Sequence, residues 1–99
     1  MKVNVHSIHF DADKDLLSFI TKKVGKLENY FDRIINSDVY LRIDNADSTI
    51  NKVAEIRMNI PGKELFAKKQ CKSFEEAADN AVDALRRQLK KYKDKNSKV

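Results

Sequence analysis

The hydrophobic residues of the last third of the chain recur at steps of three and four from Ser73 to about Lys93. In a helix these side chains would form one continuous stripe, which requires a hydrophobic surface beneath it. Glu76 follows Ser73 at the S-x-x-E spacing of a capping box, so we expect the helix to begin there. The stripe consists of Phe74, Ala77, Ala78, Ala81, Val82, Leu85, Leu89 and Tyr92.

A second helical pattern lies nearer the N-terminus, from Lys14 to Phe31. Its apolar residues again follow the helical repeat, and the carboxylate of Asp13 is in position to cap the first turn. Because these apolar residues gather on one side, we expect this helix to cover the same surface as the later one. Its stripe consists of Leu16, Leu17, Ile20, Val24, Leu27 and Phe31.

Four segments alternate between apolar and polar residues, which is typical of strands with one buried face. In the second segment, Tyr40 and Arg42 fall on the face turned away from the core. A polar connection over residues 45–51 joins the second segment to the third. Pro61 and Gly62 form a turn dipeptide, so the last two segments are predicted to pair as a hairpin. The segments are residues 1–10, Asp38 to Asp44, Ala54 to Ile60 and Lys63 to Cys71.

The order of these elements, β-α-β-β-β-α, places the chain in the α+β class. A right-handed β-α-β crossover makes the first strand parallel to the second, whereas the later connections make their strands antiparallel. We therefore predict a four-stranded mixed sheet with two helices on one face. The last helix, about 31 Å long, should extend beyond strands of about 26 Å. Residues 1–95 are predicted to form a single domain and residues 96–99 a flexible tail, loose from about Tyr92 onward.

Positive charge is concentrated near the end of the chain. The whole chain has a formal net charge of +5, whereas residues 84–99 contain seven Lys or Arg and one Asp, a net charge of +6. Two or three charges would be enough to complement the helix dipole. The excess indicates either a polyanionic partner such as RNA or a simply solvated helix end. The basic residues of this helix are Arg86, Arg87, Lys90, Lys91, Lys93 and Lys95.

The first helix carries a second basic strip, with an aromatic residue inside it. At about 100° per residue, this strip lies on a different face from the apolar stripe. Both apolar stripes face the sheet, so we expect the two basic strips to face outward, side by side. The aromatic residue, Tyr30, could stack on a base of bound RNA. The strip consists of Lys22, Lys23, Lys26, Tyr30 and Arg33.

One cluster near the N-terminus raises the question of a metal site: His6, His9, Asp11 and Asp13. In a strand the two histidines would lie on opposite faces, so the cluster does not supply a tetrahedral ligand set. The sequence has no Ser-His-Asp order, Gly-rich phosphate loop or G-x-S-x-G turn, and so small a domain has little room to enclose a substrate. We therefore expect no metal, no cofactor, no small-molecule substrate and no catalysis.

The cellular setting is also indicated by composition. The single cysteine, Cys71, cannot form an internal disulfide, which agrees with a reducing cytoplasm. No apolar run approaches the roughly 18 residues of a membrane span. A basic amphipathic helix can lie on anionic lipid, but the Ala-rich apolar face of the last helix is already needed by the sheet. We therefore favour RNA over a membrane as the partner.

The order of a helix, three antiparallel strands and a helix is similar to the double-stranded RNA-binding domain with one strand added in front. Two stretches bring a closer resemblance: KLENYFDRI, Lys26 to Ile34, and RRQLKKYKDK, Arg86 to Lys95. Both resemble the short-form ribosome hibernation-promoting factors, also called ribosome-associated inhibitors or protein Y. The resemblance extends over nearly the whole chain, and both stretches fall on the basic strips.

This resemblance implies a protein that binds the small ribosomal subunit and its 16S rRNA in stationary or stressed cells. It implies a position in the mRNA and tRNA channel near the decoding region, where the protein would inhibit translation sterically. The sequence shows no acidic C-terminal tail and no linker to a second dimerising domain. It leaves open whether the protein promotes ribosome dimers with a helper protein or silences single ribosomes. By motif position, the implied contacts are Lys23, Lys26, Tyr30, Arg87, Lys91, Lys93 and Lys95, with added charge from Arg86 and Lys90.

Two other functions remain compatible with the residues. A stand-alone domain that binds structured RNA outside the ribosome would need the same basic strips. A scaffold whose basic face binds an acidic protein would need them as well. Cosedimentation of the protein with small ribosomal subunits would distinguish ribosome binding from both of these alternatives.

Overall fold

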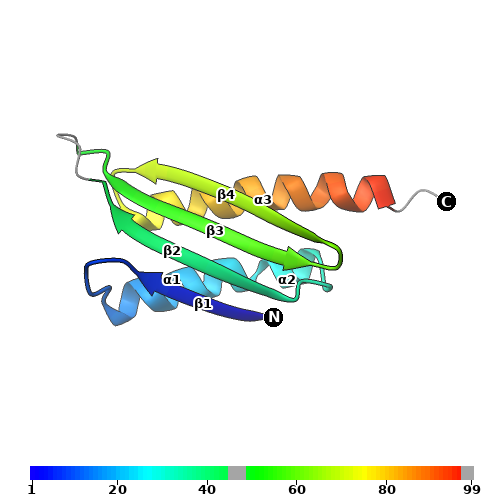
Figure 1. The fold of residues 1–99 in the computed structure, drawn as a ribbon, viewed down its shortest axis with the longest axis horizontal. Coiled ribbons are helices and arrows are strands. Elements are labelled where there is room, and N and C mark those ends of the chain that lie inside the picture. Colours follow the sequence, from blue (N-terminus) through cyan, green and yellow to red (C-terminus); the bar gives the residue numbers. More distant parts are fainter. Residues whose placement is uncertain (45–48, 97–99) are drawn as a thin grey trace.

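A computed structural model describes residues 1–44 and 49–96, with no description of the Asn96 side chain. The elements follow one another in the predicted order, except that two consecutive helices replace the predicted first helix (Figure 1). They are β1 (Lys2–Ser7), α1 (Lys14–Gly25), α2 (Leu27–Tyr30), β2 (Asn36–Ile43), β3 (Lys52–Ile60), β4 (Lys63–Cys71) and α3 (Phe74–Asn96).

The four strands form one sheet in the order β1-β2-β3-β4. β1 is parallel to β2, with Val5 opposite Val39, and the other two pairs are antiparallel. The predicted mixed sheet is therefore confirmed, including the parallel first pair that the crossover requires. The β3-β4 hairpin turns at Pro61 and Gly62, and Gly62 has a φ of 76°, a conformation that glycine adopts without strain.

Both helical segments lie on one face of the sheet and run in the same direction (Figure 1). α1 packs on β1, α3 packs on β3 and β4, and the two helices also contact each other. The residues of both predicted stripes lie in this layer: Ile20, Val24 and Leu27 from the first, and Ala77, Ala78, Ala81, Leu85 and Leu89 from the second, are buried. The core thus forms between the stripes and the alternating apolar residues of the strands, and it leaves the other sheet face open.

Both predicted helix caps are present. The Asp13 carboxylate accepts a hydrogen bond from the Leu16 amide at 2.8 Å, and the Ser73 hydroxyl oxygen accepts one from the Glu76 amide at 3.1 Å. In a complete capping box the Glu76 carboxylate would also accept a hydrogen bond from the backbone amide of Ser73. Here it accepts one from the backbone amide of Lys72, one residue earlier, at 3.4 Å. The Ser73 hydroxyl thus satisfies one amide of the first turn of α3, that of Glu76.

The helix predicted over Lys14 to Phe31 is interrupted once, at Lys26. The Lys26 amide is shared between the carbonyls of Lys22 and Val24, and the preceding residue, Gly25, is a costly residue inside a helix. Lys26 keeps helical dihedral angles, φ −64° and ψ −20°, so the chain continues into α2 with nearly the same phase. Consequently Leu27 and Phe31 remain buried, as predicted.

The last helix is longer than predicted. It continues to Asn96, whereas the sequence indicated looseness after about Tyr92. The Tyr92 ring packs edge-on against Phe31 with centroids 5.7 Å apart, and its hydroxyl donates to the Pro61 carbonyl at 3.4 Å. These contacts hold the penultimate turns against the body of the protein. As predicted, the C-terminal part of α3 extends beyond the sheet (Figure 1). Beyond Asn96, the predicted flexible tail lies outside the described residues.

Strand boundaries differ slightly from the predictions. β2 begins two residues before the predicted Asp38, and β3 begins two residues before the predicted Ala54. Pairing between these strands extends both of them, because Asn36 lies opposite Asn59 and Ile43 opposite Lys52. β4 has the predicted bounds. Of the predicted polar connection, residues 45–48 lie outside the described part of the chain.

Candidate nucleic-acid interface

The contact between α1 and α3 brings the two basic strips next to each other. The Lys23 ammonium lies 3.0 Å from the Asp79 carboxylate of α3. A hollow of about 210 Å³ follows the seam and is lined by residues of both helices. Its lining residues are Lys23, Lys26, Leu27, Tyr30, Asp79, Val82, Asp83 and Arg86. Three residues of the first predicted strip thus share one groove with one residue of the second.

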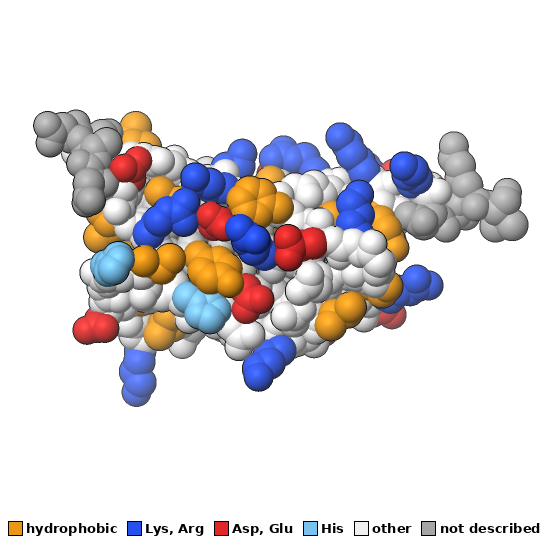
Figure 2. All heavy atoms as spheres, in the orientation of Figure 1, with side chains coloured by type: hydrophobic (Ala, Val, Ile, Leu, Met, Phe, Trp, Pro, Cys, Tyr) orange, Lys and Arg blue, Asp and Glu red, His pale blue; other side chains and the backbone are white. Residues whose placement is uncertain are grey.

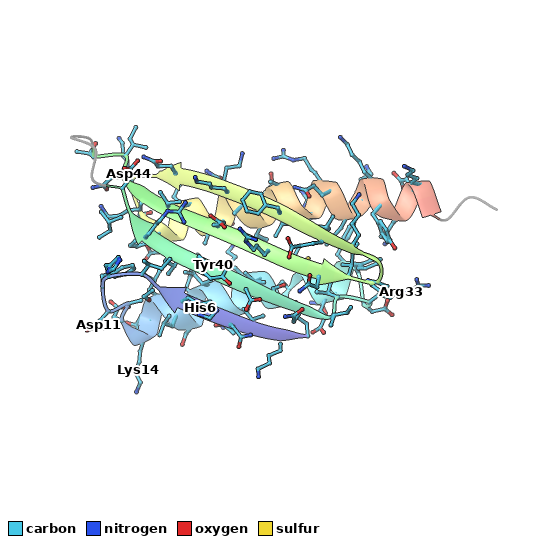
Figure 3. All side chains as sticks on the ribbon, in the orientation of Figure 1. His6, Asp11, Lys14, Arg33, Tyr40 and Asp44 are labelled. Atoms are coloured by element: carbon cyan, nitrogen blue, oxygen red, sulfur yellow. The ribbon has the colours of Figure 1, made fainter. Side chains whose placement is uncertain are left out.

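A larger hollow, about 490 Å³, lies at the end of this seam where α2 stops. The Lys93 ammonium donates to the Tyr30 carbonyl at 3.1 Å and lies 4.5 Å from the centre of the Tyr30 ring. Arg33 also lines this hollow, although it lies in the turn after α2 and not on the predicted helical face. Figure 3 shows Arg33 at the end of the sheet where the β3-β4 hairpin turns.

Asp83 holds two of the predicted arginines. Its carboxylate is 3.0 Å from the Arg86 guanidinium and 3.2 Å from that of Arg87. The hydrogen bond from Arg86 and the charge of Arg87 lower the pKa of Asp83 below its ordinary value. All three side chains are exposed to solvent, so the ion pairs contribute little to stability. Their effect is to orient the two guanidinium groups on the outer surface of α3.

Two other predicted residues lie on the opposite side of α3. Lys91 and Lys95 line a hollow of about 500 Å³ together with residues of β4. In this region, the Gln88 side chain donates to the Phe66 carbonyl at 2.8 Å, which ties the helix to the edge strand. The basic residues of α3 therefore spread around its exposed surface, from the α1 seam to the β4 edge. The predicted single strip on this helix is wider than expected.

The structure separates the predicted residues into three groups. The groove and its end bring together Lys23, Lys26, Tyr30, Arg33, Arg86 and Lys93. Arg87 is exposed beside Asp83, while Lys91 and Lys95 face the β4 side. Lys22 and Lys90 are exposed on their helices. The seam and its end therefore gather six of the predicted residues, whereas the others are distributed over the exposed sides of α1 and α3.

Sequence reasoning missed the acidic residues inside this surface. Asp79 lies beside Lys23, and Asp83 lies beside Arg86 and Arg87. The spacing of Asp83 to Arg86 and Arg87, three and four residues, is a signal that could have shown those local pairs. The pair of Lys23 and Asp79 joins two helices, so no spacing along the chain could reveal it.

The open face of the sheet, opposite the helices, presents polar and aromatic side chains (Figure 2). Tyr40 lies on this face as predicted, with its ring stacked on His6 at 4.8 Å between centroids (Figure 3). His9 lies beyond β1, with a φ of 63°. Across residues 1–44 and 49–96, no three or more His, Cys, Asp or Glu side chains are placed to hold a metal ion. None of the helices in these ranges is both long and apolar enough to cross a bilayer.

Comparisons with known proteins match nearly the whole chain and its fold. Residues 3–97 match the family model described as Sigma 54 modulation protein / S30EA ribosomal protein. The ribosome hibernation promoting factor of Escherichia coli K12 is 33% identical over 95 residues, covering 96% of each chain. That of Pseudomonas putida is 29% identical over 99 residues, covering all of this chain and 93% of the relative. A ribosomal subunit interface protein from Coxiella burnetii shares the fold, with a TM-score of 0.82 and 22% identity over 94% of this chain and 98% of that one.

Proposed function

Because this chain belongs to the Sigma 54 modulation protein / S30EA ribosomal protein family, we propose that it is a ribosome hibernation factor that binds the small subunit and inhibits translation. Members of this family are not enzymes, so the activity consists of binding. The proposed site is the mRNA and tRNA channel near the decoding region, where the partner is 16S rRNA. The proposed setting is the cytoplasm of stationary or stressed cells.

The observation that carries the proposal is the junction of the two basic strips along the α1-α3 seam. Lys23 and Lys26 from one helix share a groove with Arg86 from the other, and Lys93 closes its end over Tyr30. A ribosomal RNA surface offers dense phosphates, and clustered Lys and Arg gain affinity from the counterions that such a surface releases. A seam of this kind can follow a phosphate backbone, while Tyr30 offers a ring for an unstacked base.

The proposed mechanism is steric. The described residues form a slab with extents of 50 × 24 × 18 Å, and the long basic helix lies along its length. The core on one face of the sheet and the caps of α1 and α3 keep this slab rigid, so binding costs little ordering entropy. A rigid body held on the RNA of the channel excludes messenger and transfer RNA from the same volume. Inhibition therefore needs affinity and shape, and no covalent step.

The test is sedimentation of a stationary-phase lysate through a sucrose gradient, followed by immunodetection of the protein. We expect it in the fractions that contain small subunits and to be released as salt is raised, because phosphate contacts dominate. Absence from every ribosomal fraction at low salt would exclude the proposed function. Association with other structured RNA in those gradients would support a stand-alone RNA-binding domain in its place. A dimer peak that requires a second protein would identify a helper.

A further inference from the structure

The open face of the sheet carries side chains that the proposed function does not use. The strand register places them in rows across all four strands. One row contains His6, Tyr40, Glu55 and Lys68, and the next contains Asn4, Asp38, Arg57 and Phe66. This face is turned away from both helices and from the basic seam between them (Figures 1 and 2). It is therefore a second surface, available while the helices hold a partner.

Two aromatic side chains of this face contact a neighbouring planar group, one by stacking and one in a cation–π contact. His6 and Tyr40 stack with their planes 15° apart, and the His6 side chain is 47% exposed. The Arg57 guanidinium lies 5.5 Å from the centre of the Phe66 ring, and Phe66 is 44% exposed. A large aromatic side chain so exposed on a strand gains nothing from the core. Aromatic side chains exposed to this extent offer surface on which further planar groups can stack.

The acidic groups between these two pairs already have partners. The Glu55 carboxylate lies 3.2 Å from the guanidinium groups of both Arg42 and Arg57, and only 13% of its side chain is exposed. Asp38 accepts a hydrogen bond from the Asn4 side chain at 3.2 Å and lies 3.5 Å from the His6 ring. The two arginines thus balance the carboxylates of Glu55 and Asp38, and Lys68, opposite Glu55 on β4, adds a positive charge at the edge of the face.

A polar hollow lies next to these pairs. Its volume is about 380 Å³, and its lining includes Arg42, Lys68 and Gln70. Its acidic member, Asp44, accepts a hydrogen bond from the Gln70 amide at 3.2 Å. Two cations in a shallow polar depression suit a phosphate group. The hollow lies at the end of the row that contains Tyr40, so a phosphate here would be next to a stacked base.

We propose that the open sheet face binds a segment of single-stranded RNA. Bases stack on the His6-Tyr40 pair and on the Arg57-Phe66 pair, and a phosphate lies between Arg42 and Lys68. Single-stranded RNA is recognised by stacking on aromatic rings and arginine planes, and a four-stranded sheet is a common platform for it. Tyr40 and Phe66 are two strands and two residues apart, roughly 12 Å, so they would hold separate bases. The aromatic pairs beside cations favour nucleotides over a protein partner.

The test uses the isolated protein in a background that weakens the helix surface, Arg87→Glu with Lys91→Glu. Binding of a fluorescein-labelled twelve-nucleotide oligouridylate is measured by anisotropy, and inorganic polyphosphate serves as an anionic probe without bases. We expect the background variant to bind the oligonucleotide more tightly than polyphosphate of equal charge. Adding Tyr40→Ala and Phe66→Ala should weaken oligonucleotide binding at least about tenfold and leave polyphosphate binding unchanged.

Conservative variants show whether a loss of affinity comes from the missing rings or from a loss of the folded state. Tyr40→Phe with Phe66→Tyr keeps both rings and should restore oligonucleotide affinity to within about twofold of the background. Each variant is checked by its thermal melting curve. Equal binding of oligonucleotide and polyphosphate by the background, or unchanged oligonucleotide affinity in a folded Tyr40→Ala, Phe66→Ala variant, would overturn the proposal. Because no ribosome is present, these outcomes are independent of whether the protein binds small subunits.

Discussion

The ammonium group of Lys93 lies 4.5 Å from the centre of the Tyr30 ring and donates a hydrogen bond to the Tyr30 carbonyl at 3.1 Å. The two residues are 63 positions apart and belong to the two sequence stretches that resemble the family. Their contact closes the end of the groove between the helices. It also fixes the orientation of an aromatic ring and a cation that are both candidates for contact with RNA.

A double-mutant cycle measures this contact. Lys93→Gln removes the charge, Tyr30→Leu removes the ring, and the backbone hydrogen bond acceptor remains in both variants. We expect the two changes to be coupled by about 0.5–1 kcal/mol in the free energy of unfolding, the usual value for an exposed cation and a ring. Urea denaturation of the four proteins gives the coupling. A coupling energy of zero would mean that the contact has no energetic consequence in solution.

Charge reversal on α3 tests the proposed RNA surface. Arg87→Glu with Lys91→Glu should leave the melting temperature nearly unchanged, because exposed charges alter stability by about 0.5 kcal/mol or less. Binding to purified small subunits, measured by pelleting, should fall sharply. The affinity of the unaltered protein for small subunits should decline as the salt concentration rises, because each phosphate that the protein neutralises releases counterions.

A matched control reverses two charges away from this surface. Lys2→Glu with Lys14→Glu makes the same change in net charge, and Lys14 lies at the far end of the molecule from the tip of α3 (Figure 3). We expect this control to retain most of its affinity. Equal losses in both double variants would point to net charge, and not to the helix surface, as the cause.

The core beneath α3 depends on Leu85, whose side chain is completely buried. Leu85→Ala should lower the free energy of unfolding by about 2–5 kcal/mol, because the cavity it leaves lies between the helix and the sheet. Calorimetry should show a melting temperature lower by roughly 4–8 °C for each kcal/mol lost. The neighbouring exposed position supplies the control, Arg86→Ala, for which we expect a change within about 0.5 kcal/mol. If both variants melted alike, the assigned burial of the helix would be wrong.

The titration of Asp83 reports its two arginine partners. Its pKa is lowered by the Arg86 hydrogen bond and the Arg87 charge, so the carboxylate stays ionised to lower pH than in the unfolded chain. The stabilisation from these pairs is therefore present above the unfolded pKa and is lost as pH falls through the folded pKa. NMR titration of the Asp83 side-chain carbon should show this low midpoint. Arg86→Gln should raise it, and an unchanged midpoint would argue against the hydrogen bond.

Local sequence signals account for most of the fold. The apolar stripe with Leu85 and Leu89 predicts that the last helix packs on the sheet, and the crossover rule predicts that β1 is parallel to β2. The interruption at Lys26 and the extension to Asn96 were missed for different reasons. The first depends on how one amide is shared near a glycine, and the second on tertiary contacts of Tyr92.

The sequence by itself determined which residues are basic and which apolar residues of each helix share a buried side, because helical periodicity follows from covalent geometry. Only the tertiary structure decided which of these cations meet. The helices pack side by side in the same direction, and this brings Lys23 to Asp79 and Lys93 to Tyr30. It also turns Lys91 toward β4 and exposes a second face with Tyr40. These relations join residues distant in the chain, so they depend on the angle and register of packing, which no local pattern encodes.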